Sequence, residues 1–352
     1  MRMSLQRPIH GRGAAENPPN RFIPLYRERL DWDEDDPTPA TRFFRDDSRK
    51  ILATNDSPDI PFNFSLNPYR GCEHGCVYCY ARPTHEYLSL SAGLDFETQI
   101  FVKENAPVLL RKELASPRWV PQTVSLSGVT DAYQPIERRL ELTRRCLQVF
   151  AEFRNPIGIV TKNALVTRDI DILKELAAVD AAMVFISVTT LDPKLASLME
   201  PRASTPTARL RAIEELSKAG IPVGVMNAPI IPGLNDHESP SILEACAAAG
   251  ALAAGYVVLR LPFAVKDLFA AWLEQHFPER KDRVLGRIQE ARGGKMNDSR
   301  FGQRMKGEGE WAEVFRSMFR LQRKRLGMTD RMRELSAAAF TNGKPQQPSL
   351  FD

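Results

Sequence analysis

The sequence places three cysteines in one short stretch, Asn67-Pro-Tyr-Arg-Gly-Cys72-Glu-His-Gly-Cys76-Val-Tyr-Cys79-Tyr80, at C-x3-C-x2-C spacing. Thiolate is the usual protein ligand of iron–sulfur clusters, and three thiolates this close in one loop can ligate three irons of a cubane. The fourth iron then has no protein ligand, and an open metal position is where a substrate or cofactor binds. We therefore predict that Cys72, Cys76 and Cys79 hold one [4Fe–4S] cluster.

Two other kinds of site compete with this interpretation. The three cysteines could bind zinc together with His74 or His85, which would make the chain a zinc-stabilised nucleic-acid-binding module without catalysis. An electron carrier of the ferredoxin kind is a second alternative, but it normally supplies four cysteines per cluster. The two remaining cysteines, Cys146 and Cys246, lie outside the motif and are predicted to be small buried hydrophobic residues.

Around this motif, short apolar or β-branched runs alternate with stretches that have helical periodicity. Six such runs in succession indicate a parallel sheet, because parallel neighbours need crossover helices. A doubly wound sheet and a full or partial barrel both satisfy this pattern, and in either the chemistry collects at the carboxyl ends of the strands. The predicted strands are Phe62–Leu66, Thr123–Ser127, Ile157–Thr161, Met183–Val188, Val223–Ala228 and Gly255–Leu259. The predicted helices between them are Leu140–Phe153, Asp169–Ala178, Thr207–Ala219 and His237–Ala249.

The chain divides into four predicted regions. Residues 1–60 form an irregular N-terminal extension, because prolines and an acidic run interrupt any period, with a short docked piece near Phe43-Phe44. Residues 61–265 form the strand–helix domain, and residues 266–336 form a basic helical C-terminal region. Its helices are predicted at Val265–His276, Lys281–Ala291 and Trp311–Leu326. The tail 337–352 is predicted to be disordered.

Composition and charge narrow the classes of protein. The hydrophobic fraction of 43% and the charged fraction of 26% are ordinary for a globular protein. No apolar run approaches the ~20 residues of a membrane span, and the N-terminus has no apolar core typical of a secretory signal, so we expect a cytoplasmic protein without a membrane partner. Residues 280–333 hold 16 Lys and Arg against 7 Asp and Glu. This excess predicts either a nucleic-acid partner or a solvated helical face.

Several further motifs accompany the cysteines. N-P-Y-x-G-C-x-H-x-C-x-Y-C-Y-A-R is followed by V-T-D-x-Y-Q-P-I-E, T-K-N-x-L-V-x-R-D, S-V-T-T-L-D and P-I-I-P-G-L-N-D. This combination resembles the spore photoproduct lyase-like branch of the radical S-adenosylmethionine (SAM) superfamily over residues 62–262, more than half the chain. The resemblance implies an α/β fold, a partial (β/α)6 TIM-type barrel, with a [4Fe–4S] cluster whose open iron binds SAM. It also implies a reductant protein such as a flavodoxin or ferredoxin.

The resemblance implies that polar residues at the strand ends bind SAM. Hydroxyls and a carboxylate after the second strand can hold ammonium and ribose groups, and a lysine after the third can pair with the carboxylate. The predicted SAM-binding residues are Tyr78, Ser127, Thr130, Asp131, Lys162, Asn163 and Ser187. Thr130 or Asp131 could instead cap a turn. Arg168 either binds the same carboxylate or faces solvent, and Arg260 faces either substrate or an acidic neighbour.

The reaction itself is not predicted, and no catalytic residue is assigned. In the lyase an extra cysteine serves as hydrogen donor, whereas neither Cys146 nor Cys246 lies at a predicted strand end. We therefore predict that this chain is not a true photoproduct lyase.

Overall fold

The computed structural model describes residues 8–23, 38–331 and 333–342. Its main sheet has seven strands in the order β10-β9-β8-β7-β6-β3-β2. All neighbours pair in parallel except β2, which is antiparallel to β3. The parallel strands are β3 (Phe64–Leu66), β6 (Val124–Leu126), β7 (Ile157–Thr161), β8 (Ala182–Ser187), β9 (Val223–Ile230) and β10 (Ala253–Val258), and β2 is Leu52–Thr54. Each predicted strand overlaps one of these six, so the predicted partial α/β barrel is confirmed.

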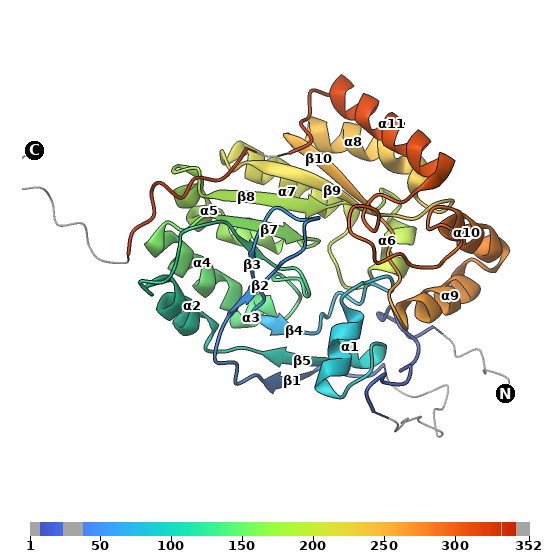
Figure 1. Ribbon diagram of the computed structural model, residues 1–352, viewed down its shortest axis with the longest axis horizontal. Coiled ribbons are helices and arrows are strands. Elements are labelled where there is room, and N and C mark those ends of the chain that lie inside the picture. Colours follow the sequence, from blue (N-terminus) through green and yellow to red (C-terminus); the bar gives the residue numbers. More distant parts are fainter. Residues whose placement is uncertain (1–7, 24–37, 332, 343–352) are drawn as a thin grey trace, which may run out of the picture.

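Helices cover one face of this sheet (Figure 1). The buried core lies between them and side chains of alternate strand residues, such as Val184 and Val223, which have no exposed surface. The covering helices are α2 (Ala106–Leu114), α4 (Leu142–Phe153), α5 (Ile170–Ala177), α7 (Pro206–Lys218) and α8 (Ser239–Ala248). Local signals set the ends of α7, since the Thr205 side chain accepts a hydrogen bond from Ala208 N and Gly220 follows with φ +78°.

The opposite face of the strands packs glycines against large side chains. A Cβ atom added at Gly224 would lie 2.5 Å from Cε1 of Phe185, and one added at Gly255 would lie 3.4 Å from Met226. A Cβ added at Gly158 would be 3.6 Å from Met183, an ordinary van der Waals distance. The close approach at Gly224 therefore holds the β8–β9 pair at its observed register, Phe185 opposite Gly224.

Gly224→Ala is expected to destabilise the protein by about 1–3 kcal/mol, because the new methyl group displaces the Phe185 ring. The free energy of unfolding in urea measures this loss. Gly158→Ala is the matched control, with little change expected. Equal effects at the two glycines would contradict this account of the packing.

A second, three-stranded sheet lies beside the barrel. It is formed by β1 (Arg42–Arg45), β5 (Gln99–Val102) and β4 (Tyr69–Arg70), in the order β1-β5-β4, next to α1 (Leu94–Thr98). The predicted docked piece at Phe43-Phe44 is thus a strand. The expectation that residues 1–60 are irregular is wrong for β1 and β2, because β1 pairs with the distant β5 and β2 pairs with β3.

The C-terminal region is helical, as predicted. It contains α9 (Val265–His276), α10 (Pro278–Glu290) and α11 (Gly309–Arg325). Helix α11 packs on α8, and its Phe315 and Phe319 rings contact Tyr256 of β10. Part of the predicted disordered tail is docked, since Thr341 N donates to the Phe153 carbonyl at 2.9 Å. Residues 343–352 lie outside the described residues.

The short elements lie in the connections between strands and helices. They are η1 (Arg82–Leu88), α3 (Glu137–Leu140), η2 (Ala164–Asp169), α6 (Pro193–Met199) and η3 (Asp236–Glu238). None of the helices in the described part of the chain is long and apolar enough to cross a lipid bilayer. The division into four regions remains a prediction.

Candidate active site

Three successive turns build the cysteine loop between β4 and η1. Gly75 N donates to the Cys72 carbonyl, Cys79 N to the Cys76 carbonyl, and Arg82 N to the Cys79 carbonyl, at 3.4, 3.2 and 3.2 Å. Gly75 has φ +67°, a conformation that an L side chain rarely adopts. The turns therefore hold the three thiols within one compact loop.

A buried arginine holds the carbonyl groups of this loop. The Arg82 guanidinium has no exposed surface and donates to the carbonyls of Cys76 at 2.9 Å and Gly75 at 3.3 Å, and it pairs with Glu97. Glu97 also accepts hydrogen bonds from Gly13 N and Ala14 N at 3.0 and 2.9 Å. The N-terminal segment is thereby fixed against the cysteine loop by backbone bonds that sequence periodicity does not reveal.

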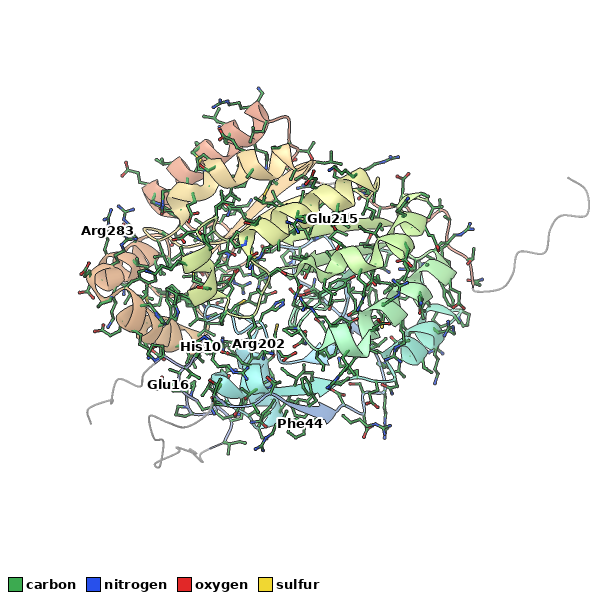
Figure 2. The ribbon with its side chains drawn as sticks, turned by 180° about the vertical axis from the view of Figure 1, so that it is seen from behind. His10, Glu16, Phe44, Arg202, Glu215 and Arg283 are labelled. Atoms are coloured by element: carbon green, nitrogen blue, oxygen red, sulfur yellow. The ribbon has the colours of Figure 1, made fainter. Side chains whose placement is uncertain are left out.

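A second arginine ties the loop to the N-terminal region. Arg202 pairs with Glu73 of the loop at 2.9 Å and donates to Thr41 Oγ1 at 3.0 Å. Figure 2 shows Arg202 in the same area as His10 of the N-terminal segment. Arg82 and Arg202 therefore fix the cysteine loop through protein contacts alone.

The thiols themselves fit an iron–sulfur cluster. Cys72 and Cys76 are buried, Cys79 is partly exposed, and burial raises the pKa of all three thiols. A bound cationic centre offsets that cost and stabilises thiolates. Among the described residues no three His, Cys, Asp or Glu side chains are grouped to share a single metal ion. A cubane has a different requirement, since each thiolate binds its own iron.

Lys162 lies where β7 ends, at the same end of the barrel. Its Nζ atom donates to Thr189 Oγ1 at 3.3 Å and to the Ala228 carbonyl at 3.0 Å, and it lies 3.4 Å from Glu200 Oε1. It also lies 5.8 Å from the centre of the Tyr78 ring in the cysteine loop. Lys162 therefore joins the ends of β7, β8 and β9 to that loop.

Glu200, which follows α6, is the buried centre of this network. Its carboxylate accepts hydrogen bonds from Tyr78 and from Thr189 Oγ1, and it pairs with the buried Arg209 of α7. Burial alone would raise the pKa of Glu200, but the charges of Arg209 and Lys162 outweigh it and lower the pKa to about 2. Sequence reasoning missed Glu200 and Arg209, since nothing in their helical segments distinguishes them from surface charges.

A second network fixes Asp131 after β6. One carboxylate oxygen accepts a hydrogen bond from Thr161 Oγ1 at 2.7 Å, and the other accepts one from Lys162 N at 2.8 Å. His74 Nδ1 lies 3.4 Å from Asp131, and His74 Nε2 lies 3.2 Å from the Asn163 amide. Burial lowers the pKa of His74, which favours a neutral ring. Asp131 and Asn163 thus link the cysteine loop to the end of β7.

The three predicted hydroxyl residues are each bonded to the backbone. Ser127 Oγ donates to the Thr130 carbonyl, Thr130 Oγ1 to the Asp131 carbonyl at 3.3 Å, and Ser187 Oγ to the Met226 carbonyl at 3.3 Å. Ser127 has φ +92°, which is uncommon for a residue with a side chain and marks a tight turn at the end of β6. All three lie at the carboxyl ends of strands, as predicted.

Arg168 does not join these residues. It pairs with Glu137 at 2.9 Å and with Asp169 at 2.8 Å, and Asp169 also accepts a hydrogen bond from Tyr133. Neither predicted role, binding of the SAM carboxylate or exposure to solvent, describes Arg168, because its side chain faces two buried carboxylates. Its role is to hold α3 and η2 together.

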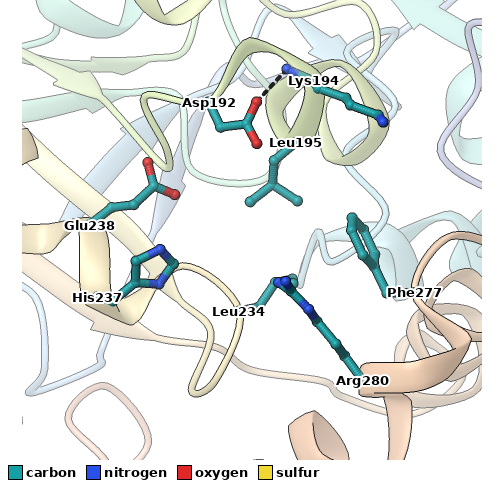
Figure 3. A pocket seen from close by; sticks show the side chains of 8 residues that line it. All are labelled: Asp192, Lys194, Leu195, Leu234, His237, Glu238, Phe277 and Arg280. Atoms are coloured by element: carbon teal, nitrogen blue, oxygen red, sulfur yellow. Dashed lines mark hydrogen bonds between the residues drawn. The ribbon is translucent and has the colours of Figure 1, made fainter.

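A pocket of about 550 Å³ lies between α6, the loop after β9 and α10 (Figure 3). Leu195, Leu234 and Phe277 form its apolar part. Its Glu238 carboxylate is occupied by Thr190 Oγ1 and Leu191 N, at 2.6 and 2.8 Å. None of the residues predicted from sequence to bind cluster or SAM lines this pocket.

A family model described as the radical SAM superfamily matches residues 66–246, more than half of the chain. The chain belongs to the radical SAM superfamily. Enzymes of this superfamily use a [4Fe–4S] cluster and SAM, and they need an electron donor. Membership of this superfamily argues against the alternative interpretation, a zinc-stabilised module without catalysis.

Curated relatives show how far the similarity extends. Uncharacterized proteins of Mycobacterium bovis and Mycobacterium tuberculosis are 39% identical over 222 residues, or 62% of this chain. The match spans 65% of their length, slightly less than two thirds. An uncharacterized protein of Methanocaldococcus jannaschii is 30% identical over 175 residues, or 50% of this chain and 63% of its own.

A solved structure shares the fold of this radical SAM protein. Spore photoproduct lyase, complexed with a dinucleoside spore photoproduct, superposes with a TM-score of 0.59 at 16% identity, over 82% of this chain and 80% of the lyase. At this identity the likeness concerns the fold alone.

Proposed function

We propose that Cys72, Cys76 and Cys79 bind the [4Fe–4S] cluster and that this chain abstracts hydrogen from a substrate. When bound, the reduced cluster supplies an electron that cleaves SAM to methionine and a 5′-deoxyadenosyl radical. The observation that carries the proposal is the short connection from the cysteine loop to the strand ends, Tyr78 to Glu200 to Lys162. It puts a fixed cation beside the loop, where an anionic group of SAM would need one.

The chain's own residues divide the work of binding SAM. We assign the SAM carboxylate to Lys162, whose ammonium donates to two neutral oxygens, lies 3.4 Å from a Glu200 carboxylate that is shared with Arg209, and stays partly exposed. Ser127, Thr130 and Ser187 offer hydroxyl oxygens to its polar groups. Asp131, Asn163 and Tyr78 are bonded mainly to protein groups. They act by orienting Lys162 and the cysteine loop. This is a narrower role than the direct binding of SAM that the sequence predicted for them.

The partners follow from this chemistry. A flavodoxin or ferredoxin is the proposed electron donor, and the cytoplasm is the proposed location. The basic C-terminal region supports a nucleic-acid substrate less than its sequence suggests, because Arg292, Arg300 and Arg304 bind protein carbonyls or carboxylates. Other basic residues of this region are exposed, among them Arg320, Lys324 and Arg325 of α11. Binding to DNA or RNA that weakens with salt would support this part of the proposal.

Anaerobic reconstitution with iron and sulfide, followed by dithionite reduction in the presence of SAM, tests the proposal. The expected result is an iron–sulfur absorption spectrum and release of 5′-deoxyadenosine. An electron carrier would show the spectrum without the nucleoside. A colourless protein after reconstitution would contradict the proposal.

Lys162→Met is expected to weaken SAM binding roughly tenfold or more while the cluster stays in place. A charge-assisted hydrogen bond contributes about 1.5–3 kcal/mol, and methionine keeps the length of the side chain without its charge. Equilibrium titration of the reconstituted protein with SAM measures the change. Lys218→Met, at an exposed lysine of α7 paired with Glu214, is the control. Unchanged SAM affinity in Lys162→Met would refute the assignment of Lys162.

A further inference from the structure

Arg260 lies at the rim of the barrel, two residues after the end of β10. Its guanidinium carbon is 5.2 Å from the centre of the Tyr80 ring, and Tyr80 directly follows Cys79. The Tyr80 hydroxyl donates to the carbonyl of Gly128, in the turn after β6. Arg260 therefore lies beside the cysteine loop, close to the end of the second barrel strand as well as the last.

The guanidinium of Arg260 is poorly satisfied by the protein. In the described part of the chain its buried Nε atom has no hydrogen-bond partner, and Nη1 has only Met305 Sδ, at 3.8 Å. Thioether sulfur is a weak acceptor. Within the described residues Arg260 forms no ion pair. The neighbouring Asp59 is already bound by Gly302 N, at 2.7 Å, and by Arg304.

Two fully buried arginines of this protein, Arg82 and Arg209, have a structural role and serve as a comparison for Arg260. Arg82 pairs with Glu97 and donates to four backbone carbonyls, and Arg209 pairs with Glu200 and donates to two. Among the residues that the structure describes, Arg260 has neither a carboxylate nor a carbonyl as a hydrogen-bond partner. Burial and the nearby charge of Arg304 lower the pKa of Arg260, and the charge of Asp59 offsets this only in part, as expected for an incompletely compensated cation. Such a cation is costly unless a ligand supplies the counter-charge.

The missing partner has a definite chemistry. A guanidinium is planar, always charged, and matches two oxygens of a carboxylate or phosphate at once. The Tyr80 ring against which it stacks is 48% exposed, so this face of the site is open to an incoming molecule. We propose that Arg260 binds an oxyanion of the substrate, a carboxylate or a phosphate, at the rim beside the cysteine loop. The substrate meant here is that of the proposed radical reaction.

Thermal unfolding of the reconstituted protein in added anions tests this inference. Sodium phosphate and sodium acetate are compared at constant ionic strength, maintained with chloride. Phosphate at saturating concentration is expected to raise the Tm of the wild type by roughly 1–3 °C if the oxyanion is a phosphate, and acetate to do so if it is a carboxylate. Arg260→Met is expected to lose this shift, and Arg260→Lys to keep less than half of it.

The behaviour without added anion gives a second readout. Arg260→Met is expected to match or exceed the Tm of the wild type in chloride alone, because it removes a cation that has no partner. Arg211→Met, at an exposed residue of α7, is the control and keeps the anion response of the wild type. An anion response that is equal in wild type and Arg260→Met, or absent from both, overturns the inference.

This measurement requires neither SAM nor turnover. A wild type that makes no 5′-deoxyadenosine, yet shows a phosphate shift that depends on Arg260, contradicts the proposed function and leaves the anion site standing. A protein that makes 5′-deoxyadenosine but has no such shift contradicts the anion site alone.

Discussion

Single replacement of Cys72, Cys76 or Cys79 by alanine is expected to abolish 5′-deoxyadenosine formation and to remove most of the bound iron. The three thiols lie in consecutive turns of one loop, and each is predicted to bind a different iron. No other cysteine can replace a lost ligand, because Cys146 and Cys246 lie in α4 and α8 with no exposed surface. Iron and sulfide analysis and the visible spectrum after anaerobic reconstitution measure the loss.

The two helical cysteines provide matched controls. Cys146→Ala and Cys246→Ala each remove a buried sulfur atom from the core, so a modest loss of stability is expected. Their iron content and their yield of 5′-deoxyadenosine should equal those of the wild type. If any one of the three motif variants keeps its full complement of iron and sulfide, the assignment of that cysteine is wrong.

The barrel could be predicted from the sequence because its signals are local and repeated. The strand Ile157–Thr161 and the helix Val265–His276 match β7 and α9 at both ends, since each is a periodic run bounded by clear breaks. The small sheet could not be predicted in the same way. Strand β4 has two residues, and β1 is an Arg-Phe-Phe-Arg segment whose residues are all exposed, so neither shows the alternation of apolar and polar residues that predicts a strand.

The candidate site likewise contains residues that the sequence predicts and residues that it does not. Cysteine spacing predicted the cluster ligands, and parallel topology predicted the strand ends where Lys162 and Asp131 lie. Arg82 stands within the quoted motif, but its bonds to the loop carbonyls depend on how the loop closes. Glu200 and Arg209 meet only after α6 and α7 have packed, and a charged residue in a helix is ordinarily expected at the surface.

Glu200→Gln is expected to destabilise the protein by about 3–5 kcal/mol at neutral pH, the cost of removing one partner from a buried ion pair. Glu200 is the carboxylate shared by Arg209, Lys162, Tyr78 and Thr189. A neutral amide would leave the buried Arg209 cation without its counter-charge. Because Tyr78 belongs to the cysteine loop, the variant should also reconstitute with less iron.

The pH dependence of this loss identifies its cause. The pKa of Glu200 in the folded protein is about 2, below its ordinary value of 4.5, so its contribution is fully present above the ordinary pKa and is lost as the pH falls toward 2. The difference in unfolding free energy between wild type and Glu200→Gln, measured in urea, should therefore be largest at pH 6–7 and shrink in acid. Glu214→Gln, at an exposed carboxylate of α7 paired with Lys218, is the control and should show a much smaller dependence, because solvent screens this pair. A difference that stays constant from pH 7 to pH 3 would mean that Glu200 stabilises the site through its shape and not through its charge.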